Sequence, residues 1–412
     1  MSAADKLALT DKLHDLEETL NYHLAKEYLV DPTKTKKYED WKGSHKPFHW
    51  YIDFYPLMAA GGFDVVLGNP PYKDLKSGGG EDTKGYETIA TKNLYPLCFE
   101  RSLKIGRDQA RIGLIVPVSS ISTEGYKSLQ KLVFGRPGHI SSFDDRPSRL
   151  FDGLEHIQLS IHLLINRTAE NNSLLVTDCR RWSAVEREFL FSLLAYTVPP
   201  ENGLPNTLPK IRSSIEASIW GKIRATRFPV AVLQSSTGGF SVYYSRKVHN
   251  FLQVLDFVPE VYGADGALRP PTELKPLRFE SSGLASLALC ALNSSLFRWY
   301  IQVFTDCRHV NKREVDNFPL LMEIDARVDK LWSSLAKSLS KSLKENSEFR
   351  SMKFAHDHLN VQCIIPKKSK PIIDQIDAAL AQHFGLTDDE LDFIVNCDIK
   401  YRLGKSNEAT DD

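Results

Sequence analysis

Three mainly apolar runs constrain the fold of this 412-residue chain more than any other feature. They are "FDVVLG" at 63–68, "RIGLIVPVSSI" at 111–121 and "IQLSIHLLIN" at 157–166. Runs without regular polar alternation are typical of strands that are buried on both faces. A helical pattern, "NLYPLCFERSLKI" at 93–105, lies between the first two runs and has Pro96 in its first turn. This order predicts an α/β fold with a partial doubly wound (Rossmann-like), parallel sheet.

The segments around these runs have other patterns. Leucines from Thr10 to about Val30 recur at helical spacing, and the aromatic stretch "SHKPFHWYIDFYPLM" at 44–58 is expected to be mostly buried. We therefore assign residues 1–60 to a helical linker region and 61–170 to the sheet, with "KSGGGEDTKG" at 76–85 as a surface loop. The later part is assigned in three stretches: 171–225 as a connector, 226–320 as a mixed α/β domain, and 321–412 as a helical C-terminal region with helices at 370–383 and 387–395 and an acidic tail.

The composition indicates the cellular compartment of the chain more clearly than its binding partners. A hydrophobic share of 42% and a charged share of 25% are ordinary for a soluble protein, and Lys plus Arg equals Asp plus Glu at 52 each. Only a mild basic bias between residues 201 and 320 favours a polyanion. The six cysteines lack C-x-x-C spacing, which argues against a zinc site and favours a reducing, cytoplasmic setting. No apolar stretch predicts insertion into a membrane, and no metal is expected.

A rigid polar corner, "NPPY" at 69–72, follows the first apolar run. Asn69 offers an acceptor and a donor on a short side chain, while Pro70 and Pro71 fix the backbone so that the Pro70 carbonyl becomes a second acceptor. Tyr72 adds a flat ring. Two acceptors beside a ring fit the exocyclic amino group of a planar heterocycle, which in DNA would be a flipped-out adenine. The alternative is an ordinary turn, because Asn-Pro and Pro-Pro are common there.

"FDVVLGNPPY" resembles motif IV of adenine-specific DNA amino-methyltransferases, and the helix and strands that follow it look like the family's next elements. Residues 279–320, from "FESSGLASL" to "VDNFPL", are similar to the C-terminal specificity domain of the TaqI-like enzymes and of fused type II restriction–modification proteins. "LTDDELDFIVNCDIKYRLG" at 386–404 resembles the end of the same large proteins. The resemblance implies methyl transfer from S-adenosylmethionine to adenine in double-stranded DNA, within a restriction–modification or phage-defence system.

The same resemblance implies roles for single residues. Asn69 and the Pro70 carbonyl would hold the amino group, Tyr72 would stack on the adenine, and Pro71 would border the methyl donor. Cys98 occupies a position near the cofactor where the family often has an aromatic residue. In the specificity domain, the candidates for DNA contact are Arg308, His309, Asn311, Lys312 and Arg313. The alternative for this cluster is a solvated helix end that pairs with Asp306 and Glu314.

The glycine-rich turn that would bind the methyl donor is not visible in the sequence. "SGGGED", "STGGF" and "YGADGA" have glycines but lack a preceding buried strand and a following helix. We therefore expect the C-terminal part of a larger enzyme, whose partner would be a separate N-terminal half or a restriction subunit. Two alternatives stay open: a catalytically silent, sequence-specific DNA-binding remnant or specificity subunit, and an RNA or protein amino-methyltransferase. No nuclease motif is evident.

Overall fold

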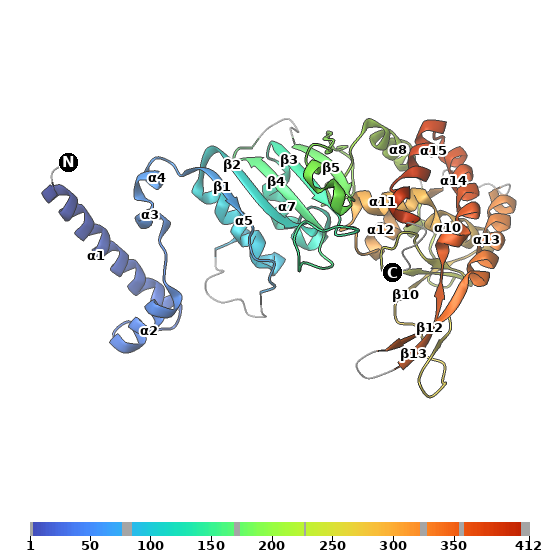
Figure 1. Ribbon diagram of the computed structural model, residues 1–412, viewed down its shortest axis with the longest axis horizontal. Coiled ribbons are helices and arrows are strands. Elements are labelled where there is room, and N and C mark those ends of the chain that lie inside the picture. Colours follow the sequence, from blue (N-terminus) through green and yellow to red (C-terminus); the bar gives the residue numbers. More distant parts are fainter. Residues whose placement is uncertain are drawn as a thin grey trace. The chain divides into compact units, whose positions relative to one another are not determined.

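The computed structural model describes residues 3–75, 85–168, 174–225, 228–321, 328–353 and 358–404. The chain forms two compact units (Figure 1). The first contains Met1–Val116, Gly125–His139 and Ile161–Leu174, and the second contains Pro117–Glu124, Ile140–Ser160 and Leu175–Asp412. The predicted surface loop at 76–85 and the acidic tail lie almost entirely outside the described residues.

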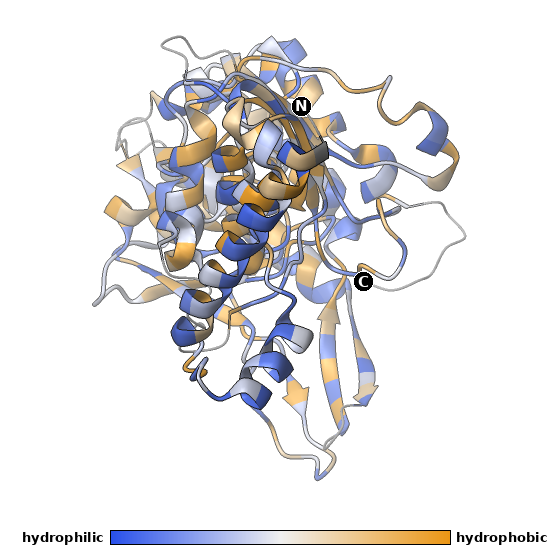
Figure 2. Cartoon of the chain, turned by 90° about the vertical axis from the view of Figure 1, so that its left-hand side faces the viewer, coloured by the Kyte–Doolittle hydropathy of each residue, from blue (hydrophilic) through white to orange (hydrophobic). Residues whose placement is uncertain are grey.

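The first unit begins with four helices: α1 (Ala3–Glu27), α2 (Thr35–His45), α3 (Trp50–Asp53) and α4 (Tyr55–Ala59). The helix begins earlier than the helical spacing from Thr10 indicated, because α1 already includes the turns before that residue. Ala25 of α1 packs with Tyr38 and Trp41 of α2 in a small core. Polar residues lie between the apolar ones along α1, the long helix at the front of Figure 2. This small core joins α1 to α2, together with the ion pair of Lys42 with Glu18.

The aromatic stretch at 44–58 differs from its prediction. Its rings contact one another and the start of the sheet, since Trp50 and Phe54 lie 5.8 and 5.1 Å from Phe63 between ring centroids. The stretch is nevertheless largely exposed, including Tyr51 and Tyr55. The prediction of burial was wrong, because the ring contacts within the stretch and with Phe63 leave most of its residues exposed.

The central sheet has five strands in the order β1-β2-β4-β3-β5. Their bounds are Phe63–Gly68 (β1), Gly106–Pro117 (β2), Gly138–Phe143 (β3), Leu159–Ile165 (β4) and Leu174–Arg180 (β5). β1 and β2 are parallel. β4 is antiparallel to β2, because the amide of Val118 bonds the carbonyl of Gln158 at one end and the amide of Asn166 bonds the carbonyl of Ala110 at the other.

The sheet is therefore mixed, and the prediction of a parallel sheet was correct for β1 and β2 but wrong for β2 and β4. Two of its strands were not predicted, and β5 lies inside the predicted connector at 171–225. Their sequences, "GHISSF" and "LLVTDCR", contain several polar residues and so do not form continuous apolar runs.

Helices cover one face of the sheet within the first unit. α5 (Leu94–Ile105) packs the ring of Phe99 against the ring of His162 in β4, with centroids 5.5 Å apart. η2 (Glu87–Thr91) and α7 (Lys127–Phe134) pack beside α5 (Figure 1). The helix predicted at 93–105 is confirmed, with Asn93 as its N-cap. The strand predicted at 63–68 is also confirmed, but its burial was wrong because β1 is the outermost strand and Val65 and Leu67 are exposed.

The second unit combines three small sheets with many helices. The sheets are β10-β7-β8 (Leu274–Phe279, Phe240–Ser245, Val254–Leu255), β11-β6 (Pro319–Leu321, Phe228–Pro229) and β12-β13-β9 (Ser347–Lys353, His358–Ile364, Val261–Tyr262). The helices up to residue 317 are α6 (Ser119–Ser122), η4 (Ala184–Phe189), α8 (Ser214–Arg224), α9 (Val230–Leu233), α10 (Ser282–Asn293), α11 (Ser295–Phe304) and α12 (Lys312–Asn317). They are followed by α13 (Val328–Glu345), η5 (Pro366–Ser369), α14 (Lys370–Phe384), α15 (Asp388–Asn396) and α16 (Ile399–Arg402). One short 3-10 helix, η3 (Glu124–Tyr126), precedes α7.

The core of the second unit is built on α10 and α11, whose residues are almost all buried. None of the described helices is long and apolar enough to cross a membrane alone, and α10 and α11 would qualify only as a pair that is bent by 64°. The helices predicted at 370–383 and 387–395 are confirmed as α14 and α15, the latter starting with a capping box of Thr387 and Glu390. The hairpin β12–β13 was not predicted in this helical region.

Candidate active site

The polar corner leaves the carboxyl end of β1, where Gly68 ends the strand. Asn69 and Pro71 are exposed, Pro70 is buried, and Tyr72 is half-buried. Because β1 and β2 are parallel and Gly68 pairs with Leu114, the carboxyl ends of both strands reach the same edge of the sheet. The next residue of β2, Ile115, therefore lies level with the corner.

Hydrogen bonds join the corner to itself and to β2. The Tyr72 hydroxyl lies 2.7 Å from Asn69 Oδ1 and 3.0 Å from the Ile115 carbonyl oxygen. A hydroxyl has one proton, so it donates to these two acceptors alternately. Burial raises the pKa of Tyr72 to about 12, which keeps that proton in place at physiological pH. Tyr72 thus holds the Asn69 side chain beside its own ring.

Aromatic rings support Tyr72 from behind. The ring of Tyr95 in α5 stands edge-on to Tyr72, with centroids 6.1 Å apart, and the ring of Tyr126 stacks on Tyr95 at 5.4 Å. Tyr95 is buried. Such edge-to-face and stacked contacts fix the plane of each ring. The Tyr72 ring is therefore oriented before any planar ligand meets it.

The segment that follows the corner is held in place by Asn93. Its Nδ2 donates to Asp74 Oδ1 at 2.8 Å, while its Oδ1 accepts from the Tyr95 amide at the start of α5. The Leu94 amide also donates to the Lys73 carbonyl at 2.9 Å. The corner is thus anchored by β1 on one side and by the start of α5 on the other.

The structure brings Asn69 and Tyr72 together, and it adds partners that sequence reasoning missed. These are the Ile115 carbonyl, Tyr95, and the pair of Asn93 and Asp74. Asn93 and Tyr95 had a signal, since both lie in the helix pattern at 93–105 that follows the corner. Cys98 lies one turn later in α5, half-buried, and burial raises the pKa of its thiol.

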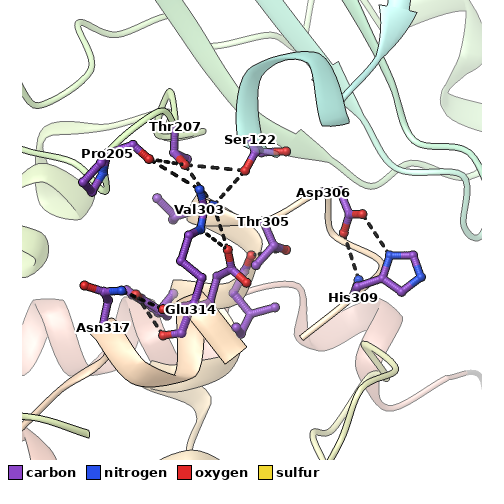
Figure 3. Close-up of polar contacts among 12 residues, drawn as sticks. Ser122, Pro205, Thr207, Val303, Thr305, Asp306, His309, Glu314 and Asn317 are labelled. Carbon is purple, nitrogen blue, oxygen red and sulfur yellow. Dashed lines mark hydrogen bonds and ion pairs between the residues drawn. The ribbon is translucent and has the colours of Figure 1, made fainter. Parts of the chain in front are cut away.

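The predicted DNA contacts lie in the second unit, at and before α12. Asp306 organises the first of them: its Oδ1 accepts from the amides of Arg308 and His309, and its Oδ2 lies 2.9 Å from His309 Nδ1 (Figure 3). The Arg308 side chain is exposed and bonds the carbonyl of His156. Asn311 is the N-cap residue of α12, and Lys312 forms an exposed ion pair with Asp316.

Arg313 points away from the other candidates, toward other elements of the second unit. Its Nε lies 2.7 Å from Glu314 Oε1, and its Nη2 donates to the Ser122 carbonyl at 2.8 Å and to the Thr207 hydroxyl at 3.1 Å (Figure 3). Nearby, the buried Lys210 donates to the carbonyls of Val303 and Thr305. The pairing alternative is thus what the structure shows for Arg313 and, through Asp306, for His309.

Among the described residues, no strand leads through a Gly-x-Gly turn into a helix: Gly61 and Gly62 precede β1, and Gly238 and Gly239 precede β7. In the same described ranges, no group of three His, Cys, Asp or Glu residues is arranged to hold a metal ion.

Comparison with known proteins finds a family match in the N-terminal part of the chain. Residues 4–147 match the family described as Eco57I restriction-modification methylase. The matched part therefore contains α1, the corner and the strands β1 to β3. A Methanocaldococcus jannaschii protein, named for a type II restriction enzyme and methyltransferase, is 33% identical over 89 residues, which are 22% of this chain and 8% of that protein.

The solved structures that resemble this chain share a lower sequence identity with it. The type IIL restriction-modification enzyme MmeI in complex with DNA has a TM-score of 0.41 at 10% identity, covering 82% of this chain and 57% of that one. A nuclease-deletion mutant of the type ISP enzyme LlaGI, in complex with a DNA substrate mimic, has a TM-score of 0.38 at 10% identity, covering 77% and 47%. The chain thus spans about half the length of these two proteins.

Proposed function

We propose that this chain is the base-capturing and specificity part of an adenine-specific DNA methyltransferase in a restriction–modification or phage-defence system. The observation that carries the proposal is the corner at the carboxyl end of β1, where the Asn69 amide and the Tyr72 ring are held together by a 2.7 Å hydrogen bond. The match of residues 4–147 to a restriction-modification methylase family supports it.

The chemistry follows from the two acceptors at the corner. Asn69 Oδ1 and the Pro70 carbonyl would each accept one hydrogen bond from the amino group of a flipped adenine, whose ring would stack on Tyr72. Accepting both bonds pulls the nitrogen lone pair out of conjugation with the ring, which makes the nitrogen more nucleophilic. Asn69 Oδ1 has two lone pairs, so it can accept a hydrogen bond from the adenine amino group while it accepts one from the Tyr72 hydroxyl. The Tyr72 hydroxyl can also donate to the Ile115 carbonyl instead. S-adenosylmethionine would supply the methyl group from outside the residues described.

Contacts to double-stranded DNA are proposed for Arg308, Asn311 and Lys312, and His309 is left out because its ring pairs with Asp306. Arg308 and Lys312 are exposed and positively charged, as phosphate contacts require, and Asn311 offers an amide that can read a base edge. Arg313 is left out of this set because its guanidinium is engaged within the second unit.

The test is the substitution Asn69→Ala, made in the active methyltransferase that contains this chain. Genomic DNA from a bacterial host without adenine methylation is sequenced for N6-methyladenine, and DNA affinity is measured in parallel. We expect methylation to be lost while affinity changes less than about threefold, because Asn69 contacts only the flipped base. Unchanged methylation would refute the role of the corner.

A second function, that of a catalytically silent DNA-binding subunit, is favoured by one observation: no methyl-donor turn is present among the described residues. It predicts sequence-dependent, salt-sensitive DNA binding that needs no cofactor. This second function would be excluded if an assembly that contains this chain methylated DNA and the Asn69→Ala variant of that assembly did not.

A further inference from the structure

An open groove lies beside β10 in the second unit, and its two walls come from segments that are distant in the chain. Its volume is about 410 Å³, and it is lined by Gln234, Ser235, Ser236, Pro276 and Arg278. The Ser235 amide donates to the Arg278 carbonyl at 2.9 Å, so the first segment runs along the edge of β10. Gly238 allows this close approach, because a Cβ there would lie 2.4 Å from the Phe279 carbonyl oxygen.

Arg278 is the cation of this groove. Its side chain and that of Pro276 share one face of β10, since residues two apart in a strand point the same way. Leu277 and Phe279, on the other face, are buried, so Arg278 stands on the solvent face. It is exposed, and its guanidinium has no hydrogen-bond or ion-pair partner among the described residues. A guanidinium presents its donors as a planar fork, which matches the oxygens of a phosphate group.

The acidic residues near the groove are already engaged by other side chains. Asp316 Oδ1 accepts from Gln234 Nε2 at 2.8 Å, which fixes the Gln234 amide in the wall of the groove. Glu280 accepts hydrogen bonds from the hydroxyls of Ser235 and Thr237. Within the described part of the chain, the charge of Arg278 is therefore not compensated by a carboxylate. An anionic ligand would supply the missing acceptors.

The groove adjoins the surface for which DNA contacts are proposed. Asp316 belongs to α12, and it joins Gln234 to Lys312 because its other carboxylate oxygen forms the ion pair with that lysine (Figure 1). The wall of the groove and an exposed candidate for phosphate contact thus share one carboxylate.

Two more exposed cations lie on the same surface. Arg246 and Lys247 directly follow β7, and their segment pairs with the segment of Arg308 and His309. The pairing hydrogen bonds join the Val248 amide to the Arg308 carbonyl at 3.0 Å and the Val310 amide to the Arg246 carbonyl at 2.8 Å. Positive charge is therefore concentrated here, although the whole chain has equal numbers of basic and acidic residues.

We propose that this groove binds a phosphodiester group of the DNA backbone, with Arg278 as the main contact. This rests on the proposed function and adds a site outside the cluster at 308–313. The exposed Ser236 hydroxyl is a further donor from the opposite wall. A backbone contact fixes the position of the duplex beside α12 without reading its sequence. Arg278 is thus a positioning contact, in contrast to Asn311, whose amide can read a base edge.

The test compares Arg278→Ala with the matched control Lys275→Ala in the full chain. Lys275 is an exposed cation of the same strand, and its side chain belongs to the other face of β10. Binding of two labelled duplexes of unrelated sequence is measured by fluorescence anisotropy at several salt concentrations. Circular dichroism checks that each variant is folded.

We expect Arg278→Ala to weaken binding of both duplexes about tenfold, because charge-assisted hydrogen bonds to one phosphate are lost. The slope of the logarithm of the binding constant against the logarithm of salt concentration should become less steep by about one. Arg278→Lys keeps the charge but not the fork, so it should keep the slope and recover part of the affinity. Lys275→Ala should bind as wild type does.

The proposal would be overturned if wild type did not bind DNA, if the slope of Arg278→Ala stayed unchanged, or if Lys275→Ala changed it equally. A loss confined to one duplex would make Arg278 a base contact instead. Micromolar binding of inorganic phosphate to wild type, measured by titration calorimetry, would assign the groove to a free anion. Asn69→Ala should bind both duplexes normally, so a chain that binds DNA through Arg278 but transfers no methyl group in any assembly would contradict only the proposed function.

Discussion

Arg313 offers the sharpest test of the structure, because it was predicted to contact DNA and instead ties α12 to distant parts of its unit. Its side chain is 21% exposed, and its partner Glu314 is 2% exposed. Arg313 contacts Glu314 Oε1, and Glu314 Oε2 has no hydrogen-bond partner among the described residues. In Arg313→Ala a buried carboxylate therefore loses the cation that compensates it, and the Ser122 carbonyl and the Thr207 hydroxyl lose a donor.

Breaking a buried ion pair by removing one partner costs about 3 to 5 kcal/mol, and we expect a loss of at least about 3 kcal/mol in the free energy of unfolding. The variant Lys312→Ala, at the neighbouring residue, is the control. The Lys312 side chain that pairs with Asp316 is 71% exposed, and exposed ion pairs contribute about 0 to 1 kcal/mol to the free energy of unfolding. Adding Glu314→Gln to Arg313→Ala removes the unpaired charge and should restore about 1 kcal/mol or more.

The assay is urea unfolding followed by tryptophan fluorescence, which reports mainly the second unit because Trp182, Trp220, Trp299 and Trp332 lie there. The slope of free energy against urea must stay the same for the comparison to hold. If Arg313→Ala were no more destabilising than Lys312→Ala, the structural role of Arg313 would be refuted.

Three further predictions concern the corner, the DNA contacts and the core. Tyr72→Phe keeps the ring but loses the hydrogen bond to Asn69, so methylation should fall less than about tenfold. Tyr72→Ala also loses the stacking of the adenine, worth about 1 to 3 kcal/mol, and should be less active. Equal activity of the two variants would contradict this prediction. Replacing Arg308 and Lys312 by alanine should weaken DNA binding and leave the free energy of unfolding unchanged. The slope of the logarithm of the DNA-binding constant against the logarithm of salt concentration should become less steep by about one for each phosphate that is no longer neutralised. An unaltered slope would argue against phosphate binding by these side chains. Burial lowers the pKa of His162 to about 3, so below about pH 6.5 the unfolded chain binds a proton that the folded chain does not, and the folded state loses stability. Between pH 7 and pH 5 the free energy of unfolding of wild type should fall by about 2 kcal/mol more than that of His162→Leu. Parallel curves of unfolding free energy against pH would contradict this.

The sequence predicted local features well where one type of pattern was continuous. The strand at 63–68, the helices α5, α14 and α15, and the Asn69–Tyr72 corner each follow from a run of neighbouring residues. β3 and β5 were missed because their polar residues interrupt that signal, and β12–β13 was missed within a segment read as helical. Local patterns report the backbone conformation that neighbouring residues favour, and they carry little information about which strands pair.

Burial and side-chain partners were decided by the tertiary structure. An apolar strand such as β1 has the same sequence whether a neighbour covers it or not, and only the strand order showed that β1 pairs with β2 alone among the described strands of its sheet. Likewise, nothing near Arg313 in the chain indicates that its guanidinium bonds the carbonyl of Ser122, 191 residues earlier. By itself the sequence determined the chemistry available at the corner, since that depends on residue types and their spacing. The fold decided which residues face that chemistry and which surface is left open, because both depend on segments that are distant in the chain and meet only in three dimensions.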